Sequence, residues 1–148
     1  MVGLYFSYRQ TTHVVEALRV NLNSRITTNT LDLDRVFIEK HHLREYFYEG
    51  KEIPDNHSDF HLALAIAELK LDIFEHNMLT YRDIDRVLPR DEHSNAWRQG
   101  NDEWIEFSFS NSPILCKYLE ARKAWYTKEL YDAMKAAMQK KNKGGQQE

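Results

Sequence analysis

The stretch HSDFHLALAIAELKLDIFEHNMLTY, residues His57–Tyr81, decides the fold that the sequence predicts. It is the longest run with helical apolar spacing, and it contains neither glycine nor proline. One set of its apolar side chains recurs at steps of three and four residues: Phe60, Leu64, Ala67, Leu71, Phe74 and Met78. A second set widens this face: Leu62, Ile66, Leu69 and Ile73. Because so wide an apolar surface must be covered on more than one side, we expect this helix to form the centre of the domain.

The composition is that of a single globular domain. The chain has 148 residues, of which 42% are hydrophobic and 12% aromatic, which is enough for one sizeable core and too little for two. Its formal net charge of -3 provides no basic field for a nucleic acid backbone, so nucleic acid is not an expected partner. The single cysteine, Cys116, excludes an internal disulfide framework and favours a reducing compartment. We therefore expect a cytoplasmic protein.

The first segment of the chain carries a narrow apolar seam. Its members recur at alternating steps of four and three residues: Leu4, Tyr8, Thr11, Val15, Leu18 and Leu22. This spacing is typical of a helix that pairs with another helix. We expect a protein partner or self-association through Leu4, Tyr8, Val15, Leu18 and Leu22. Residues 21–30 are rich in Asn, Ser and Thr but contain no Gly or Pro, so one long helix and two shorter helices both remain open.

The same segment has a second interpretation, as a stalk beside a membrane. Charged residues from Arg9 onward interrupt it, so no window of about 18 apolar residues is available to cross a bilayer. The start MVGLYFSYR nevertheless has aromatic residues followed by Arg9, a pattern found where a spanning helix leaves the bilayer. Attachment of the amino terminus to the cytoplasmic face of a membrane and an ordinary amphipathic start both remain open.

Turn and cap residues mark the region before the central helix. Gly50 can adopt the left-handed conformation after a helix and Pro54 cannot continue one, so a helix should end near Tyr48. Asp55 or Ser58 is then placed to cap the central helix.

Similar signals divide the second half of the chain. The polar stretch after the central helix, which contains Pro89 and Gly100, is typical of a connection with a short helical piece at Ile84, Val87 and Leu88. Another helix should begin at Asn101 or Asp102. Ser112 is a favourable cap for a helix that starts with proline and runs over residues 113–126. Thr127 should begin the last helix.

These signals predict an all-α fold, with a long amino-terminal helix followed by a compact helical bundle. We assign residues 1–27 to the amino-terminal helix, a stalk or the remnant of a membrane anchor. Residues 28–139 are assigned to the bundle. Residues 140–148, KKNKGGQQE, should form a disordered tail, because they have no apolar side chains to bury.

Three stretches carry a family resemblance: FIEKHHLREYFYEG at Phe37–Gly50, AELKLDIFEH at Ala67–His76 and WIEFSFSNSPILCKYLEARKAWY at Trp104–Tyr126. In combination they resemble a family of small helical bacterial proteins of unknown function, found in cyanobacteria and actinobacteria, that often carry an amino-terminal membrane helix. The chain departs from the family pattern at His42, where those proteins often have a proline. The resemblance covers most of the chain, and it implies a helical bundle and an anchor rather than a chemical activity.

Glu68, Asp72 and His76 follow one another at steps of four residues, which places two carboxylates and an imidazole on one face of the central helix. One hypothesis is a metal-dependent or small-ligand-binding helical-bundle enzyme that uses these three residues. A di-iron bundle requires further Glu and His ligands from other helices, and the sequence contains no second such element. The other interpretation is a polar seam with one buried carboxylate. We predict Asp72 as this buried member, with Arg44 or Trp104 as its donor.

Aromatic residues supply the remaining candidates for a binding surface. Three consecutive rings precede Gly50 and cannot all face the same side of a helix. The candidate binding residues are Arg44, Tyr46, Phe47, Tyr48, Asp72, Trp97, Trp104, Trp125 and Tyr126. No cofactor, metal ligand set or catalytic residue is predicted. The sequence favours a non-catalytic interaction or scaffold domain over the enzyme.

Overall fold

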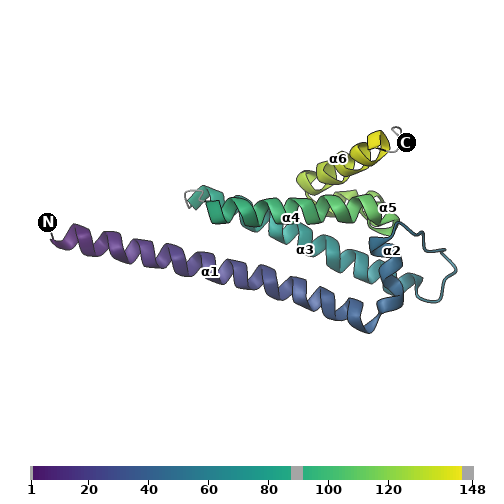
Figure 1. Ribbon diagram of the computed structural model, residues 1–148, viewed down its shortest axis with the longest axis horizontal. Helices are drawn as coiled ribbons and strands as arrows, with labels where there is room; N and C mark the ends of the chain where they lie inside the picture. Colours follow the sequence, from purple (N-terminus) through teal and green to yellow (C-terminus); the bar gives the residue numbers. More distant parts are fainter. Residues whose placement is uncertain (1, 88–91, 145–148) are drawn as a thin grey trace.

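The computed structural model describes residues 2–87 and 92–144, all of whose regular elements are helices. The predicted all-α class is confirmed. The elements are α1 (Val2–Glu39), the 3-10 turn η1 (His41–Leu43), α2 (Arg44–Tyr48), α3 (Phe60–Val87), α4 (Glu92–Asn111), α5 (Pro113–Ala121), the 3-10 turn η2 (Lys123–Trp125) and α6 (Lys128–Gly144). In Figure 1, α3 and α4 lie side by side, α1 runs along one side of them and α6 lies on the other. The first part of α1 extends well beyond the end of the bundle.

The predicted central helix is the centre of the core. Both apolar sets of α3 contribute buried residues, and these pack against side chains from all the other α-helices. Rings join at right angles here: Phe74 of α3 contacts Trp104 of α4 with ring centroids 4.7 Å apart. Burying an aromatic or branched side chain stabilises the fold by about 1.5 to 3 kcal/mol, so this shared core holds the helices together.

The ends of α3 differ from the prediction. The helix begins at Phe60 rather than His57 and continues past Tyr81 to Val87. Its first turn is reached through tight turns in which the Asp59 amide donates to Nδ1 of His57 at 3.1 Å. The Asp59 carbonyl then accepts from Ala63, so Asp59 stands at the helix start and Asp55 and Ser58 precede it.

Gly100 does not separate two helices, contrary to the prediction. It lies inside α4, a single helix from Glu92 to Asn111. A glycine weakens a helix interior by roughly 0.5 to 1 kcal/mol relative to alanine, and the packing of α4 against α3, α5 and α6 outweighs this cost. Gly50, by contrast, has a φ of 74° and ends α2 as predicted.

The helix predicted from Pro113 is present, but it ends at Ala121 and gives way to η2 before Tyr126. Ser112 precedes it as predicted, yet its hydroxyl does not cap the helix. The buried Ser112 hydroxyl donates to the Tyr46 carbonyl at 3.0 Å instead, and so joins the start of α5 to α2.

The last helix begins after Thr127 as predicted and extends to Gly144. Residues 140–144, expected in the tail, are therefore helical, and residues 145–148 lie outside the described part. Two lysines in this last turn contact α4: Lys140 pairs with Glu106 at 2.6 Å, and Lys141 donates to the Ser110 carbonyl at 2.8 Å. These contacts hold the polar end of α6 against α4.

The amino-terminal segment is one helix, which resolves the alternative that the sequence left open. α1 continues through residue 27 without a break, and its later part packs on α3 through the buried residues Ile26, Leu33 and Phe37. Over the residues that the structure describes, no helix combines the length and apolar character needed to cross a membrane.

Candidate functional site

A lysine is buried at the centre of the molecule. The side chain of Lys70, on α3, is 0% exposed, and its Nζ has no hydrogen-bond partner within the described residues. Five aromatic rings surround this nitrogen, and the nearest is Tyr48, whose ring centroid lies 4.3 Å away. The other four have centroids 5.8 to 6.0 Å away: Phe37, Phe47, Phe74 and Trp104. We call these five rings and Lys70 the lysine cage.

Burial lowers the pKa of Lys70 to about 7, because the charged ammonium has lost its water, and the nearby positive charge of Arg44 adds to the effect. Asp34 acts weakly in the opposite direction. The electron-rich ring faces attract a cation, so they offset part of this desolvation. The cage therefore holds an amine that changes its charge near neutral pH.

Three of the predicted binding residues belong to this cage. Phe47, Tyr48 and Trp104 face Lys70, and the Arg44 guanidinium lies 4.8 Å from the Tyr48 ring centroid, on the rim. Tyr46 belongs elsewhere: its ring packs on His57, with centroids 5.8 Å apart. The predicted aromatic cluster is thus divided, and most of it forms core rather than an open surface.

The prediction that Asp72 is the buried carboxylate is wrong. Asp72 is exposed on α3, where it accepts a hydrogen bond from Tyr126. Trp104 belongs to the lysine cage instead, and Arg44 lies on its rim. Partial burial and the neighbouring carboxylates Glu68 and Glu75 raise the pKa of Asp72 above its ordinary value, while the Tyr126 hydrogen bond opposes the change. The apolar residues next to Asp72 in sequence face inward, and the helix turns Asp72 itself outward.

Two tyrosine hydroxyls and a backbone amide donate hydrogen bonds to the carboxylates on this face of α3. The Tyr118 hydroxyl donates to Glu68 at 2.7 Å, and the Thr127 amide donates to Glu75 at 2.5 Å. Burial and the carboxylate neighbour raise the pKa of Tyr118 to about 12. The face therefore docks α5 and the segment before α6 onto the central helix.

The third member of the predicted enzyme site, His76, is exposed on α3. Nowhere in residues 2–87 and 92–144 do three His, Cys, Asp or Glu side chains converge as metal ligands would.

Trp125 is exposed, and its ring stacks with the Arg122 guanidinium at 5.1 Å. Cys116 is half-buried, and desolvation raises the pKa of its thiol to about 11, so it is not an activated nucleophile at neutral pH.

An open hollow of about 300 Å³ lies where α1 meets the ends of α3 and α4. Its lining residues are Ile26, Thr30, Asn77, Tyr81, Trp97, Gly100, Asn101 and Trp104. Two buried amides lie in its wall: the Asn77 side chain donates to Asn101 Oδ1 at 3.0 Å. Trp97 is 43% exposed, whereas Trp104 also belongs to the lysine cage. We call this feature the tryptophan hollow.

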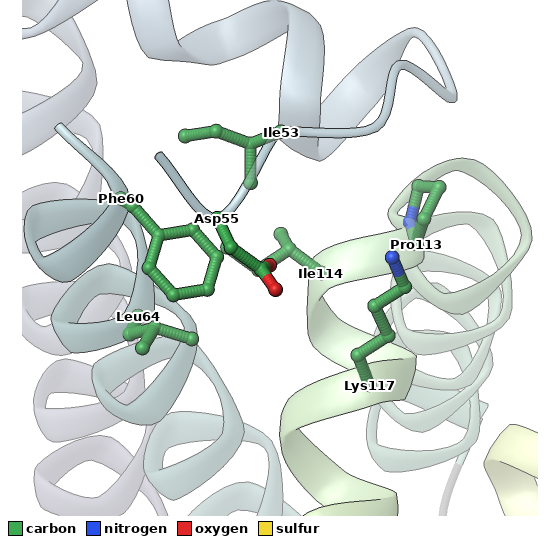
Figure 2. Close-up of a pocket in the computed structure, with 7 residues that line it drawn as sticks. All are labelled: Ile53, Asp55, Phe60, Leu64, Pro113, Ile114 and Lys117. Atoms are coloured by element: carbon green, nitrogen blue, oxygen red, sulfur yellow. The ribbon is translucent and has the colours of Figure 1, made fainter. Parts of the chain in front are cut away.

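A second, much smaller cavity of about 40 Å³ lies between the start of α3, the loop before it and α5. In Figure 2, Phe60 and Leu64 approach from α3 and Ile114 from α5, and the Asp55 carboxylate lies between them. Lys117 stands at the edge and pairs with Glu52 at 3.2 Å. The space suits a water molecule better than a ligand.

The helix α1 leaves an apolar surface uncovered beyond the bundle. Val14 is 61% exposed and Val20 is 69% exposed, and Leu18, a seam residue, is 47% exposed. Two further members of the predicted seam, Val15 and Leu22, are half-buried. Leu22 lies one turn before Ile26, where the bundle begins to cover the helix.

Comparisons of the chain with protein-family models, with curated proteins and with solved structures found no match.

Proposed function

We propose that this protein is a non-catalytic helical interaction domain that pairs with a second copy of itself through the first half of α1. The observation that carries the proposal is an apolar seam, with Leu18 exposed, on a helix that extends past its own bundle. The seam residues Leu18 and Leu22 are separated by one helical turn, and Ile26 follows at the same spacing. The seam therefore continues the face that the bundle covers farther along α1.

An isolated helix of this kind has little to hold it. Isolated helices are marginal in water, and the flanks of this one are polar or charged. Alternating steps of four and three residues are the pattern by which two helices interlock, and the pattern is the same on each copy. A second copy thus supplies a complementary surface without any further component.

The enzyme alternative receives less support. Glu68 and Asp72 each accept a hydrogen bond from a tyrosine, and His76 faces solvent on the same helix. The lysine cage surrounds its amine with rings, and neither cavity described above has Lys70 in its lining. We therefore assign the α3 carboxylates and the lysine cage a structural role in the bundle.

The test compares Leu18→Glu with Val20→Glu by sedimentation equilibrium. Both residues are exposed valine or leucine side chains on the same helix, but Leu18 lies in the seam and Val20 lies off it. The unmodified chain and Val20→Glu should form dimers, and Leu18→Glu should remain a monomer with unchanged helix content. A monomeric unmodified chain, or equal dimer formation by the two variants, overturns the proposal. Flotation of the monomeric chain with anionic phospholipid vesicles would assign the helix to a membrane instead.

A further inference from the structure

We infer that the two copies pair antiparallel, so that the first turns of each α1 reach the tryptophan hollow of the other copy. This inference rests on the proposed function and specifies its geometry. Three features of the structure lead to it: the side of α1 that the bundle covers, the register of the seam, and the position of the tryptophan hollow.

The bundle restricts the direction of pairing. At about 100° per residue, Leu22 and Ile26 lie 40° apart around α1, so the exposed seam and the bundle-covered surface are nearly the same face. In a parallel pair, both bundles would then have to occupy the same space beside the paired helices. An antiparallel pair places the bundles at opposite ends, where each has room.

The register follows from the ends of the seam. Antiparallel pairing of the full seam sets Leu4 opposite Leu22 and Tyr8 opposite Leu18, so any two opposed positions have numbers that sum to 26. Ile26 of one copy then lies at the level where the α1 helix of the other begins. The residues of those first turns, VGLYF at positions 2–6, are among the most apolar of the helix.

The tryptophan hollow lies at this level. Ile26 and Thr30 form its α1 side, and Trp97 and Tyr81 form part of the opposite side. Trp97 is the exposed aromatic side chain of this open depression, and tryptophan is a typical anchor residue of protein interfaces. Gly100 lines the hollow, and an added Cβ there would meet no atom within 4 Å, so a larger side chain can be placed at this position without a clash. The tryptophan hollow therefore begins one helical turn beyond Leu22, at the end of the seam.

Pulsed electron spin resonance tests the direction. A spin label is placed on Ser24→Cys, an exposed site on α1, in a Cys116→Ser background. In the antiparallel pair, the two labels lie 22 residues apart along the axis, a separation of roughly 33 Å, whereas a parallel pair brings them within about 20 Å. The long distance is expected. A short distance overturns the antiparallel geometry while leaving self-association intact.

A larger side chain at Gly100 tests whether the tryptophan hollow takes part in dimerisation. Gly100→Leu adds a leucine side chain at the lining of the hollow, and Ala96→Leu places the same side chain on α4 at a residue outside the lining. Because leucine favours a helix more than glycine does, neither variant should lose its fold. Gly100→Leu should weaken dimerisation at least tenfold, roughly a 1.4 kcal/mol loss, relative to Ala96→Leu. Equal dimerisation constants for the two variants overturn the role of the hollow, and a monomeric unmodified chain overturns the proposed function itself.

Discussion

Replacing Lys70 with methionine should stabilise the protein, and the gain should depend on pH. Methionine has nearly the shape of lysine and no charge to desolvate. A fall in the pKa of a fully buried lysine from 10.5 to about 7 corresponds to a penalty of about 4 to 5 kcal/mol when the amine is charged. Methionine removes this penalty and leaves the ring contacts of the side-chain stem in place, so we expect Lys70→Met to be about 4 kcal/mol more stable at pH 7.

The sign of the pH dependence follows from proton binding. Below pH 7, Lys70 holds a proton in both the folded and the unfolded chain, so the penalty is constant. Between pH 7 and 10.5, the unfolded chain holds a proton that the folded chain lacks, so the free energy of unfolding rises with pH. From pH 7 to 8.5, this rise should be about 1.5 kcal/mol for the unmodified chain.

Urea unfolding at pH 6, 7, 8 and 8.5 measures both effects. The difference between the unmodified chain and Lys70→Met isolates Lys70, because groups such as Cys116, whose raised pKa acts at higher pH, are present in both. Lys117→Met serves as control, since Lys117 is exposed and pairs with Glu52. A stability difference that stays constant over this range, or a methionine variant less stable than the unmodified chain, would contradict a desolvation penalty at Lys70.

Two further substitutions test single hydrogen bonds. Tyr118→Phe removes the 2.7 Å bond to Glu68 and should lower the free energy of unfolding by about 1 kcal/mol, whereas Tyr131→Phe, whose bonds to Glu120 are exposed, should cost less in the same denaturant titration. Ser112→Ala leaves the buried Tyr46 carbonyl without the Ser112 hydroxyl and should cost about 1 to 2 kcal/mol; a melting temperature equal to that of the unmodified chain would contradict the link between α2 and α5.

The sequence predicted the helical class and the central helix because apolar periodicity records which face is buried. It predicted the φ of Gly50 and the starts of α5 and α6 because these depend on local backbone chemistry. It misplaced the end of α3 and the break at Gly100, since long-range packing extended both helices through weak local signals.

The candidate site was harder to predict, because a charged residue is ordinarily assigned to the surface. Lys70 belongs to a buried row of α3 at steps of four and three residues: Ala63, Ala67, Lys70, Phe74, Asn77 and Tyr81. That regular spacing was a signal for the burial of Lys70 and Asn77. Asp72 falls outside the row, on the exposed face. The partner of Asp72 depends on how Tyr126 is brought back to α3, which no local pattern contains.

In the proposed function, the first half of α1 associates with another copy and is not part of the core. Thermal unfolding of a chain that lacks residues 1–22, measured by circular dichroism alongside sedimentation of the same sample, tests it most directly. The truncated chain should show no dimer, and its melting temperature should be close to that of the full chain measured below the dimer dissociation constant. A truncated chain that is unfolded, or that still dimerises, would contradict it.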